Sequence, residues 1–272
     1  MSNFGSLGVK AEYISKYDAK LLFPIERSVK RKELGLDVNN LPFYGIDLWN
    51  HYEVSWLNMH GKPMVALGVI VVPADSKYLI ESKSMKLYFN SFNNTKFASA
   101  KDVVETVIRD LSKSCAADVG FELIDVDNDA KISKLDMLCL DSLDIEFDQY
   151  TPDPELLTTA DNMVTTSVYS NLLKSNCLVT NQPDWGTVVI SYTGNMINYE
   201  GLLRYIVSFR NHNEFHEQCV ERIFNDILVR CKPETLTVYA RYTRRGGLDI
   251  NPYRTTGREL ISSFYDLRFV RQ

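Results

Sequence analysis

Cysteine is scarce in this sequence and is never closely paired. The 272 residues contain five cysteines, an odd number without any C-x-x-C pattern: Cys115, Cys139, Cys177, Cys219 and Cys231. A disulfide framework needs an even set of cysteines, and a ribbon-type zinc site needs closely spaced pairs. The sequence therefore argues against both, and we expect most of these thiols to be reduced and buried.

Long apolar runs and an excess of positive charge are also missing. No stretch approaches the roughly 20 apolar residues of a membrane helix, and Met1–Ser6 lacks the basic and apolar regions of a signal peptide. We therefore expect a cytoplasmic protein with no membrane partner. The formal net charge is -5 at pH 7, whereas duplex-binding proteins carry a concentrated basic face, so no direct contact with nucleic acid is expected.

The common nucleotide and metal motifs are absent as well. Neither G-x-G-x-x-G nor G-x-x-x-x-G-K-[ST] occurs, so any nucleotide is held without a Rossmann fold or a P-loop. His212 and His216 are four residues apart, but a zinc hydrolase needs its glutamate directly after the first histidine, and Glu214 stands two positions after it. We predict no metal site and interpret His216 as a hydrogen-bonding or proton-transfer group.

The sequence does contain one structural pattern twice. Alternating and helical spacings in the first half predict two strands, two helices and two strands: 43–57, 62–73, 82–92, 99–115, 117–126 and 135–148. The second half repeats this order: strands near 162–174 and 186–194, helices near 199–211 and 215–231, a strand near 235–243 and a terminal extended segment. We therefore expect a duplicated α+β chain.

The residue types themselves also support the repeat. Ser91–Phe97 lines up with Ser208–Phe215 after one insertion, and Asp110 then falls on Asp226. Prolines and polar residues from Tyr150 to Pro154 indicate a linker. The expected organisation is an N-terminal arm, a first module, a linker and a second module, at 1–42, 43–149, 150–160 and 161–272.

One segment of the second half gathers reactive groups. Ser175–Gly186 carries Cys177 between polar neighbours and Asp184 after a probable turn, and Phe215-His216-Glu217 follows 39 residues after the cysteine. A thiol, an acid and an imidazole are enough to build a covalent catalyst. Taken singly, three of these residues have a plain alternative. Cys177 could be a buried inert thiol, Asp184 a turn residue after proline, and Glu217 a first-turn carboxylate.

Basic residues occur at two further places. Lys83 and Lys86 can project from one face at the start of a helix, where anions are favoured. Arg244 and Arg245 stand beside a Gly-Gly bend that begins at Gly246, which lets backbone and guanidinium groups approach phosphates. The alternatives are a solvated helix face and a basic hairpin turn.

Taken together, these segments resemble the NADPH-dependent 7-cyano-7-deazaguanine reductases of queuosine biosynthesis, in their long, two-module form. The resemblance rests on motifs in the family's order: Glu81–Phe89, Ser175–Gly186, Ser208–Glu217 and Arg244–Pro252. It implies an α+β fold of tandem tunnelling-fold modules, in which ferredoxin-like ββααββ units pair antiparallel sheets into a barrel. It also implies an oxidoreductase that reduces the nitrile of this deazapurine to an aminomethyl group. Two NADPH are needed, because a nitrile takes up four electrons in becoming an amine.

The resemblance also assigns roles to residues. Cys177 attacks the nitrile carbon to give a covalent thioimide, Asp184 supplies a proton to the nitrile nitrogen, and His216 supplies a later proton. Glu217 binds the guanine-like edge, Glu81 reaches the same ring, and Phe215 packs on its face. The expected substrate contacts are Glu81, Ser82, Phe215 and Glu217. The expected cofactor contacts are Ser82, Lys83, Lys86, Arg244, Arg245 and Gly246.

The first half lacks the cysteine and the His-Glu pair, which implies one site per chain. Free strand edges on the tandem modules favour a homodimer. Two alternatives remain open: a GTP cyclohydrolase-like hydrolase and a non-catalytic deazapurine-binding protein on the same fold.

Overall fold

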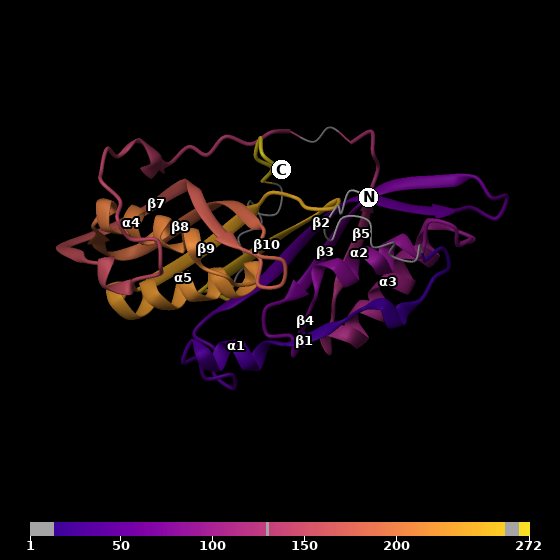
Figure 1. Cartoon of the computed structure of the whole chain (residues 1–272), viewed down its shortest axis with the longest axis horizontal. Coiled ribbons are helices and arrows are strands. Elements are labelled where there is room, and N and C mark those ends of the chain that lie inside the picture. The colour runs from indigo at the N-terminus through magenta and orange to yellow at the C-terminus, as the bar shows by residue number, and fades with distance from the viewer. Residues whose placement is uncertain (1–13, 129–130, 259–266) are drawn as a thin grey trace, which may run out of the picture.

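The central element of the chain is one large sheet. A computed structural model describes residues 14–128, 131–258 and 267–272, so the first thirteen residues of the expected arm and parts of both expected modules lie outside it. In the described ranges the strand order of the sheet is β5-β3-β2-β10-β9-β8-β7-β6 (Figure 1). The strands are β2 (Tyr44–Leu57), β3 (Pro63–Pro73), β5 (Gly120–Ile124), β6 (Leu138–Cys139), β7 (Thr159–Asn176), β8 (Pro183–Ile197), β9 (Thr235–Tyr242) and β10 (Leu248–Thr255). A second, small sheet pairs β1 (Pro24–Glu26) with β4 (Tyr78–Ile80).

Helices pack on the strands of both halves and confirm the mixed α+β class. The described ranges contain α1 (Arg27–Glu33), α2 (Ser82–Asn90), α3 (Ala100–Cys115), α4 (Tyr199–Ser208) and α5 (His216–Cys231). Val103, Val107 and Leu111 recur every four residues on α3 and are fully buried against the first half of the sheet. The Ser99 side chain accepts from Asp102 N, one of the free N–H groups in the first turn of this helix, which is the usual reason that a helix begins after such a residue. A second core lies under α4 and α5.

The same side-chain contacts recur in both halves. Tyr88 donates its hydroxyl proton to Asp110 Oδ2 at 2.8 Å, and Tyr205 donates to Asp226 Oδ2 at 2.6 Å. The second half has the expected element order, β7-β8-α4-α5-β9-β10. Polar contacts buried in equivalent places indicate a duplicated unit rather than two chance arrangements.

One detail of the expected repeat is wrong. Phe97 N donates to Leu57 O at 2.9 Å, and Glu214 N donates to Asn176 O at 3.1 Å. Backbone pairing therefore makes Phe97 equivalent to Glu214 and not to Phe215, so no insertion precedes this point. The two halves differ just afterwards, where the second half enters its helix one residue sooner.

The strand predicted at 135–148 is also wrong. Only Leu138–Cys139 forms a strand, β6, and it pairs in parallel with β7 of the second half. Leu143, Ile145 and Phe147 instead pack their half-buried side chains against the second core. Apolar residues that alternate with a period of two indicate an extended backbone with one covered face. They do not show whether another strand pairs with that backbone.

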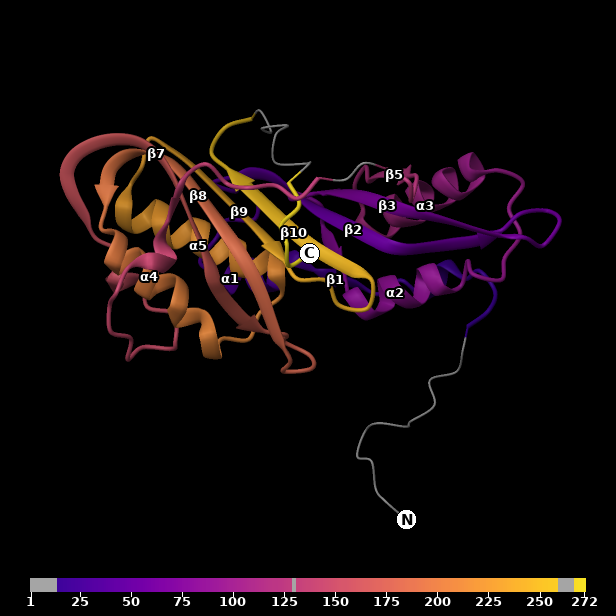
Figure 2. The ribbon, with the colours of Figure 1, turned by 90° about the horizontal axis from the view of Figure 1, so that it is seen from above.

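The halves join through β2 and β10, which pair antiparallel from Leu248 opposite His51 to Thr255 opposite Tyr44 (Figure 2). In the described residues the sheet is open, with β5 and β6 at its two edges. No helix in the described part is both long and apolar enough to cross a membrane.

Candidate active site

A short backbone pairing brings together the two reactive segments of the second half. Asn176, the last residue of β7, donates its N–H to His212 O at 2.7 Å and accepts from Glu214 N. Cys177 follows Asn176 directly, and α5 begins two residues after Glu214. Cys177 and His216 are therefore neighbours in space, although 39 residues separate them in sequence.

The chain then turns back towards β8. Cys177 N donates to Gln182 O at 2.8 Å, and Asn181 N donates to Cys177 O at 3.0 Å. Asn181 has φ +56°, a left-handed conformation that asparagine tolerates better than most residues. This turn places Asp184 opposite Ser175, at the same end of the sheet as the cysteine.

A cavity of about 40 Å³ lies where both halves meet this turn. Seven of the expected site residues line it: Ser82, Cys177, Asp184, Phe215, His216, Glu217 and Arg245. Sequence reasoning missed the other lining residues: Leu79, Ile80, Glu214, Thr243, Leu248 and Ile250. Most of these are apolar wall positions that look like core residues in sequence. Leu79 and Ile80 directly precede the Glu81–Phe89 motif, which is the signal that could have indicated them.

The Cys177 thiol lies in an activating environment. Its residue is 9% exposed. Burial raises the pKa of this thiol, but hydrogen bonds from Thr180, Arg245 and the Val179 N–H outweigh burial and lower the pKa below its ordinary value. Burial instead raises the pKa of Cys219 to about 12 and that of Cys231 to about 11. Because the thiolate is the nucleophile, Cys177 is activated and these two are not.

Asp184 connects the cysteine to the imidazole. Its residue is 2% exposed, with Oδ2 3.3 Å from His216 Nε2 and Oδ1 2.8 Å from Arg245 Nε. The His216 ring stacks on Tyr242 with its centroid 3.8 Å away and the planes 7° apart. This stacking fixes the imidazole so that Nε2 faces the carboxylate.

Glu217 is the second carboxyl group of the cavity and is 2% exposed. Burial raises the pKa of Glu217 to about 7, and the charge of Asp47 adds to this effect, while Arg27 and His216 oppose it. Near neutral pH this side chain can therefore take either protonation state. Its ionised form can accept two N–H donors, the pattern that a guanine-like edge presents.

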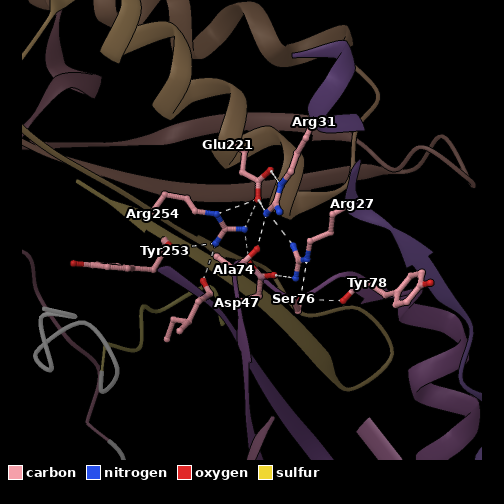
Figure 3. A network of polar contacts seen from close by, with 10 residues as sticks. Arg27, Arg31, Asp47, Ala74, Ser76, Tyr78, Glu221, Tyr253 and Arg254 are labelled. Atoms are coloured by element: carbon pink, nitrogen blue, oxygen red, sulfur yellow. Dashed lines mark hydrogen bonds and ion pairs between the residues drawn. The ribbon is translucent and has the colours of Figure 1, made fainter. Parts of the chain in front are cut away.

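A buried ionic network lies one helical turn along α5 from Glu217 (Figure 3). Glu221 Oε1 is 2.7 Å from Arg31 Nη2 and 2.8 Å from Arg254 Nη2. Asp47 binds Arg254 at 2.8 Å and Arg27 at 2.5 Å. Three guanidinium groups and two carboxylates form this network, and two of the cations come from α1. Helix α1 therefore supports the helix that carries His216 and Glu217.

Glu81 lies just outside the cavity and caps α2. Its carboxylate accepts from Lys83 N at 2.9 Å and from Ser84 N at 2.7 Å. Each carboxylate oxygen still has a free lone pair, so Glu81 can accept from a bound ring while it holds these amides. While it holds them, the start of α2 has little free capacity for an anion.

The remaining basic residues lie on the rim beside the cavity. Lys86 Nζ is 3.9 Å from Glu53 Oε2 and lies against Gly246, where a Cβ would come within 2.8 Å of that nitrogen. Arg244 stacks over the Tyr52 ring at 4.6 Å and is exposed, as is Lys83. Cations close to a glycine backbone fit the phosphates of a dinucleotide. Arg245 differs, because it already pairs with Asp184. In the described part of the chain, no group of three or more His, Cys, Asp or Glu could hold a metal ion.

Comparisons with known proteins agree with the resemblance. A family model described as "Nitrile reductase, 7-cyano-7-deazaguanine-reductase N-term" matches residues 13–123, and one described as "QueF-like protein" matches residues 183–260. A protein of Dechloromonas aromatica (strain RCB) is 58% identical over 259 residues, which are 94% of this chain and 92% of that protein. Proteins of Legionella pneumophila are 56% identical over 259 residues (strain Corby; 94% of this chain, 91% of that protein) and 52% identical over 275 residues (strain Lens; 100% and 96%). All three are named NADPH-dependent 7-cyano-7-deazaguanine reductase. With such identity over nearly its whole length, this chain belongs to the family of NADPH-dependent 7-cyano-7-deazaguanine reductases.

Proposed function

We propose that this chain reduces 7-cyano-7-deazaguanine to 7-aminomethyl-7-deazaguanine with two NADPH, a step of queuosine biosynthesis, through a covalent thioimide on Cys177. The observation that carries the proposal is the activated Cys177 thiol, which shares one cavity with Asp184, His216 and Glu217. The substrate is the free deazapurine, and neither nucleic acid nor a membrane takes part. NADPH and a free reactive thiol are typical of the reducing cytoplasm.

The first step is thioimide formation, with Asp184 as the proton donor. The Cys177 thiolate attacks the nitrile carbon, an S–C bond forms, and one π pair of the C≡N bond moves to nitrogen. Asp184 delivers one proton to that nitrogen, and the product is a neutral thioimide. His216, with Nε2 3.3 Å from Asp184, supplies a proton when the amine forms.

NADPH, when bound, supplies a pair of electrons as hydride, and the four-electron change requires two molecules in succession. Lys83, Lys86 and Arg244 would hold its phosphates beside Gly246, with Ser82 between this rim and the cavity. The walls of the cavity keep water away from the imine that exists between the two reductions. Leu79, Ile80 and Leu248 form that apolar wall.

Glu217 would bind the guanine-like edge in its ionised form, and Phe215 would pack on the face of the ring. Glu81 would contact the same ring through the lone pairs that the amides of α2 leave free. A purine-sized ring needs more space than about 40 Å³. Binding therefore moves part of the cavity wall.

We further infer a tandem tunnelling fold with modules at 43–149 and 161–272, an arm at 1–42 and a linker at 150–160. Separate cores under α2 and α3 and under α4 and α5 support this division. We infer that two copies associate and close their open sheets into a barrel. The two strand edges of the sheet support that step, because an unpaired edge favours association.

The test is NADPH oxidation on addition of 7-cyano-7-deazaguanine, together with the intact mass of the protein. We expect two NADPH consumed for each nitrile and, without NADPH, a covalent adduct of substrate mass. The variant Cys177→Ala should lose turnover and adduct and still bind the substrate, and Cys219→Ala serves as the matched control. Full activity of Cys177→Ala would overturn the mechanism, and absence of oxidation by folded wild-type protein would overturn the function.

A further inference from the structure

The cavity wall contains a buried carboxylate that takes no part in the proposed reaction steps. Glu214 is 4% exposed and lies two residues before α5. Its Oε1 accepts from Arg222 Nη2 at 2.5 Å and its Oε2 from Arg222 Nε at 3.1 Å, and His212 Nε2 lies 3.0 Å from the same Oε2. A guanidinium fork and an imidazole therefore surround this carboxylate, and Arg222 belongs to the helix that carries His216.

The segment 212–214 also holds the loop that carries the nucleophile. The carbonyl of its first residue accepts from Asn176 N at 2.7 Å, and the N–H of its last residue donates to Asn176 O at 3.1 Å. Between them, Asn213 Nδ2 donates to Asn181 Oδ1 at 2.8 Å. The segment thus contacts the Cys177 loop on both sides of the cysteine.

The first half makes the same backbone bridge without a buried charge. Leu57 N donates to Thr95 O at 2.9 Å, and Leu57 O accepts from Phe97 N at 2.9 Å. Phe97 is therefore the counterpart of Glu214, and its ring stacks on Phe92 with centroids 5.2 Å apart and planes 8° apart. The fold does not require a carboxylate at this place, and burial of a charge costs free energy. The charge of Glu214 therefore indicates a task in the half that carries the nucleophile.

We propose that Glu214 is a positioning residue, which ties the Cys177 loop to α5 through the Arg222 fork. The nucleophile then stays aligned with a bound nitrile and with the imidazole on that helix. Two parallel contacts of a planar guanidinium fix orientation as well as distance. Without them the loop and the helix can shift past each other, and a misplacement of about 1 Å can cost about a hundredfold in rate. The role in the reaction rests on the proposed function, whereas the hold on the loop does not, because those contacts exist without substrate.

The test separates alignment from binding and from the reactivity of the thiol. Adduct formation with saturating 7-cyano-7-deazaguanine, without NADPH, is followed by intact mass over time. In Glu214→Gln we expect this rate to fall by about ten- to a hundredfold. The dissociation constant of the same change in the Cys177→Ala background should stay close to that of its parent. Alkylation of Cys177 by iodoacetamide should be no slower than in the wild type, because this small reagent needs no alignment and loss of a nearby negative charge does not disfavour the thiolate.

Two further variants complete the comparison. Arg222→Lys keeps the positive charge but loses the fork, so its adduct rate should lie between those of the wild type and Glu214→Gln. Glu155 pairs with Arg230 near the other end of α5 at 2.8 Å, with its side chain 74% exposed. Glu155→Gln is the matched control and should form the adduct at the wild-type rate.

A wild-type adduct rate in folded Glu214→Gln would overturn the proposal, and so would an equal loss in Glu155→Gln. Alkylation that slows in parallel, or weaker binding that accounts for the lost rate, would overturn it as well. If Glu214→Gln does not fold, Arg222→Lys decides, and a wild-type rate there contradicts the role of the fork. If wild type forms no adduct at all, the proposed function fails. Hydrogen exchange at the Asn176 and Asn181 amides then decides the hold on the loop, which faster exchange in Glu214→Gln supports and unchanged exchange overturns.

Discussion

Glu217 combines full burial with a charge that the proposed substrate requires. Burial and the charge of Asp47 hold the pKa of this carboxyl group near 7, against the opposing effects of Arg27 and His216. Only the ionised carboxylate accepts two N–H donors. In the proposed function the deazapurine therefore binds the deprotonated form of Glu217, although this side chain is partly protonated in the free protein near neutral pH.

This leads to a prediction about pH and affinity. The dissociation constant of 7-cyano-7-deazaguanine, measured by calorimetry on Cys177→Ala, should rise as pH falls below about 7, approaching tenfold per pH unit. Glu217→Gln in the same background should bind more weakly, by about 1–3 kcal/mol. Its affinity should no longer change through this pH range. A Cys177→Ala affinity that stays constant from pH 8 to pH 5.5 would contradict the role of Glu217.

Much of the site could be predicted at the residue scale. The motifs around Cys177, Asp184, His216 and Glu217 indicated groups that the structure does bring into one cavity. The partner of Arg245 could not be predicted, because it depends on how the β9–β10 turn packs against the loop after β7. The contact of Glu81 with the ring stays a prediction, since this side chain caps α2 here.

At the scale of elements, the short helix α1 matters through its two arginines. Arg27 and Arg31 are 3% and 4% exposed, and both face Glu221 on α5. Burial raises the pKa of Glu221, but Arg254, Arg31 and Arg27 outweigh it and lower the pKa to about 2. Removal of this carboxylate would break the ion pair of Arg31 and leave Arg27 and Arg254 with Asp47.

We therefore predict that Glu221→Gln costs about 3–5 kcal/mol of unfolding free energy, as expected for a buried ion pair that loses one partner. Urea unfolding at pH 7 measures it. Glu33→Gln breaks the exposed Lys30–Glu33 pair of α1 and is the matched control, with an expected cost of at most about 1 kcal/mol.

The same network predicts how stability changes with acid. Because the folded pKa of Glu221 is depressed to about 2, its contribution is present above the unfolded value near 4.5 and is lost as pH falls towards 2. Wild type should lose about 3 kcal/mol more than Glu221→Gln over this interval. Equal acid sensitivity of both proteins, or equal cost of Glu221→Gln and Glu33→Gln in urea, would show that the network does not support α5.

The periodicity of apolar residues predicted most of the helices and strands, and its failure at 135–148 has a physical reason. The helical spacing of Val103, Val107 and Leu111 predicted α3 because a buried helical face repeats every three to four residues. The alternation from 135 to 148 predicted a strand, yet only Leu138–Cys139 found a neighbouring strand. Alternation in the sequence indicates which side chains point to the same face. Pairing with another strand depends instead on which edge of the folded sheet is free.

At the scale of the whole molecule, each half contributes different groups to the cavity at their junction. Ser82, Leu79 and Ile80 come from the first half, and Cys177 and His216 come from the second. The antiparallel pairing of β2 with β10 joins the halves in one sheet. Sequence comparison of the halves indicated the duplication. It could not indicate that β2 pairs with β10, because these strands lie far apart in the sequence.

The open sheet leads to the last prediction, a homodimer. In the described residues β5 forms one edge, and β6 covers β7 only opposite Val168 and Tyr169. Residues 159–163 of β7 are exposed. Such edges present unpaired N–H and C=O groups, and a two-fold axis lets a second copy satisfy them while the sheets close into a barrel.

Sedimentation should therefore give twice the 31.2 kDa of the chain at micromolar concentration. Hydrogen exchange should be slow for outer amides of β5 and β7 and fast for the exposed β2–β3 turn near His60, which serves as the internal control. Dilution that yields monomer should speed exchange at these two edges before it affects the central strands β9 and β10. A stable monomer, or a dimer whose β5 and β7 amides exchange as fast as those of the turn, would contradict closure through the edges, because the unpaired groups would then still face water.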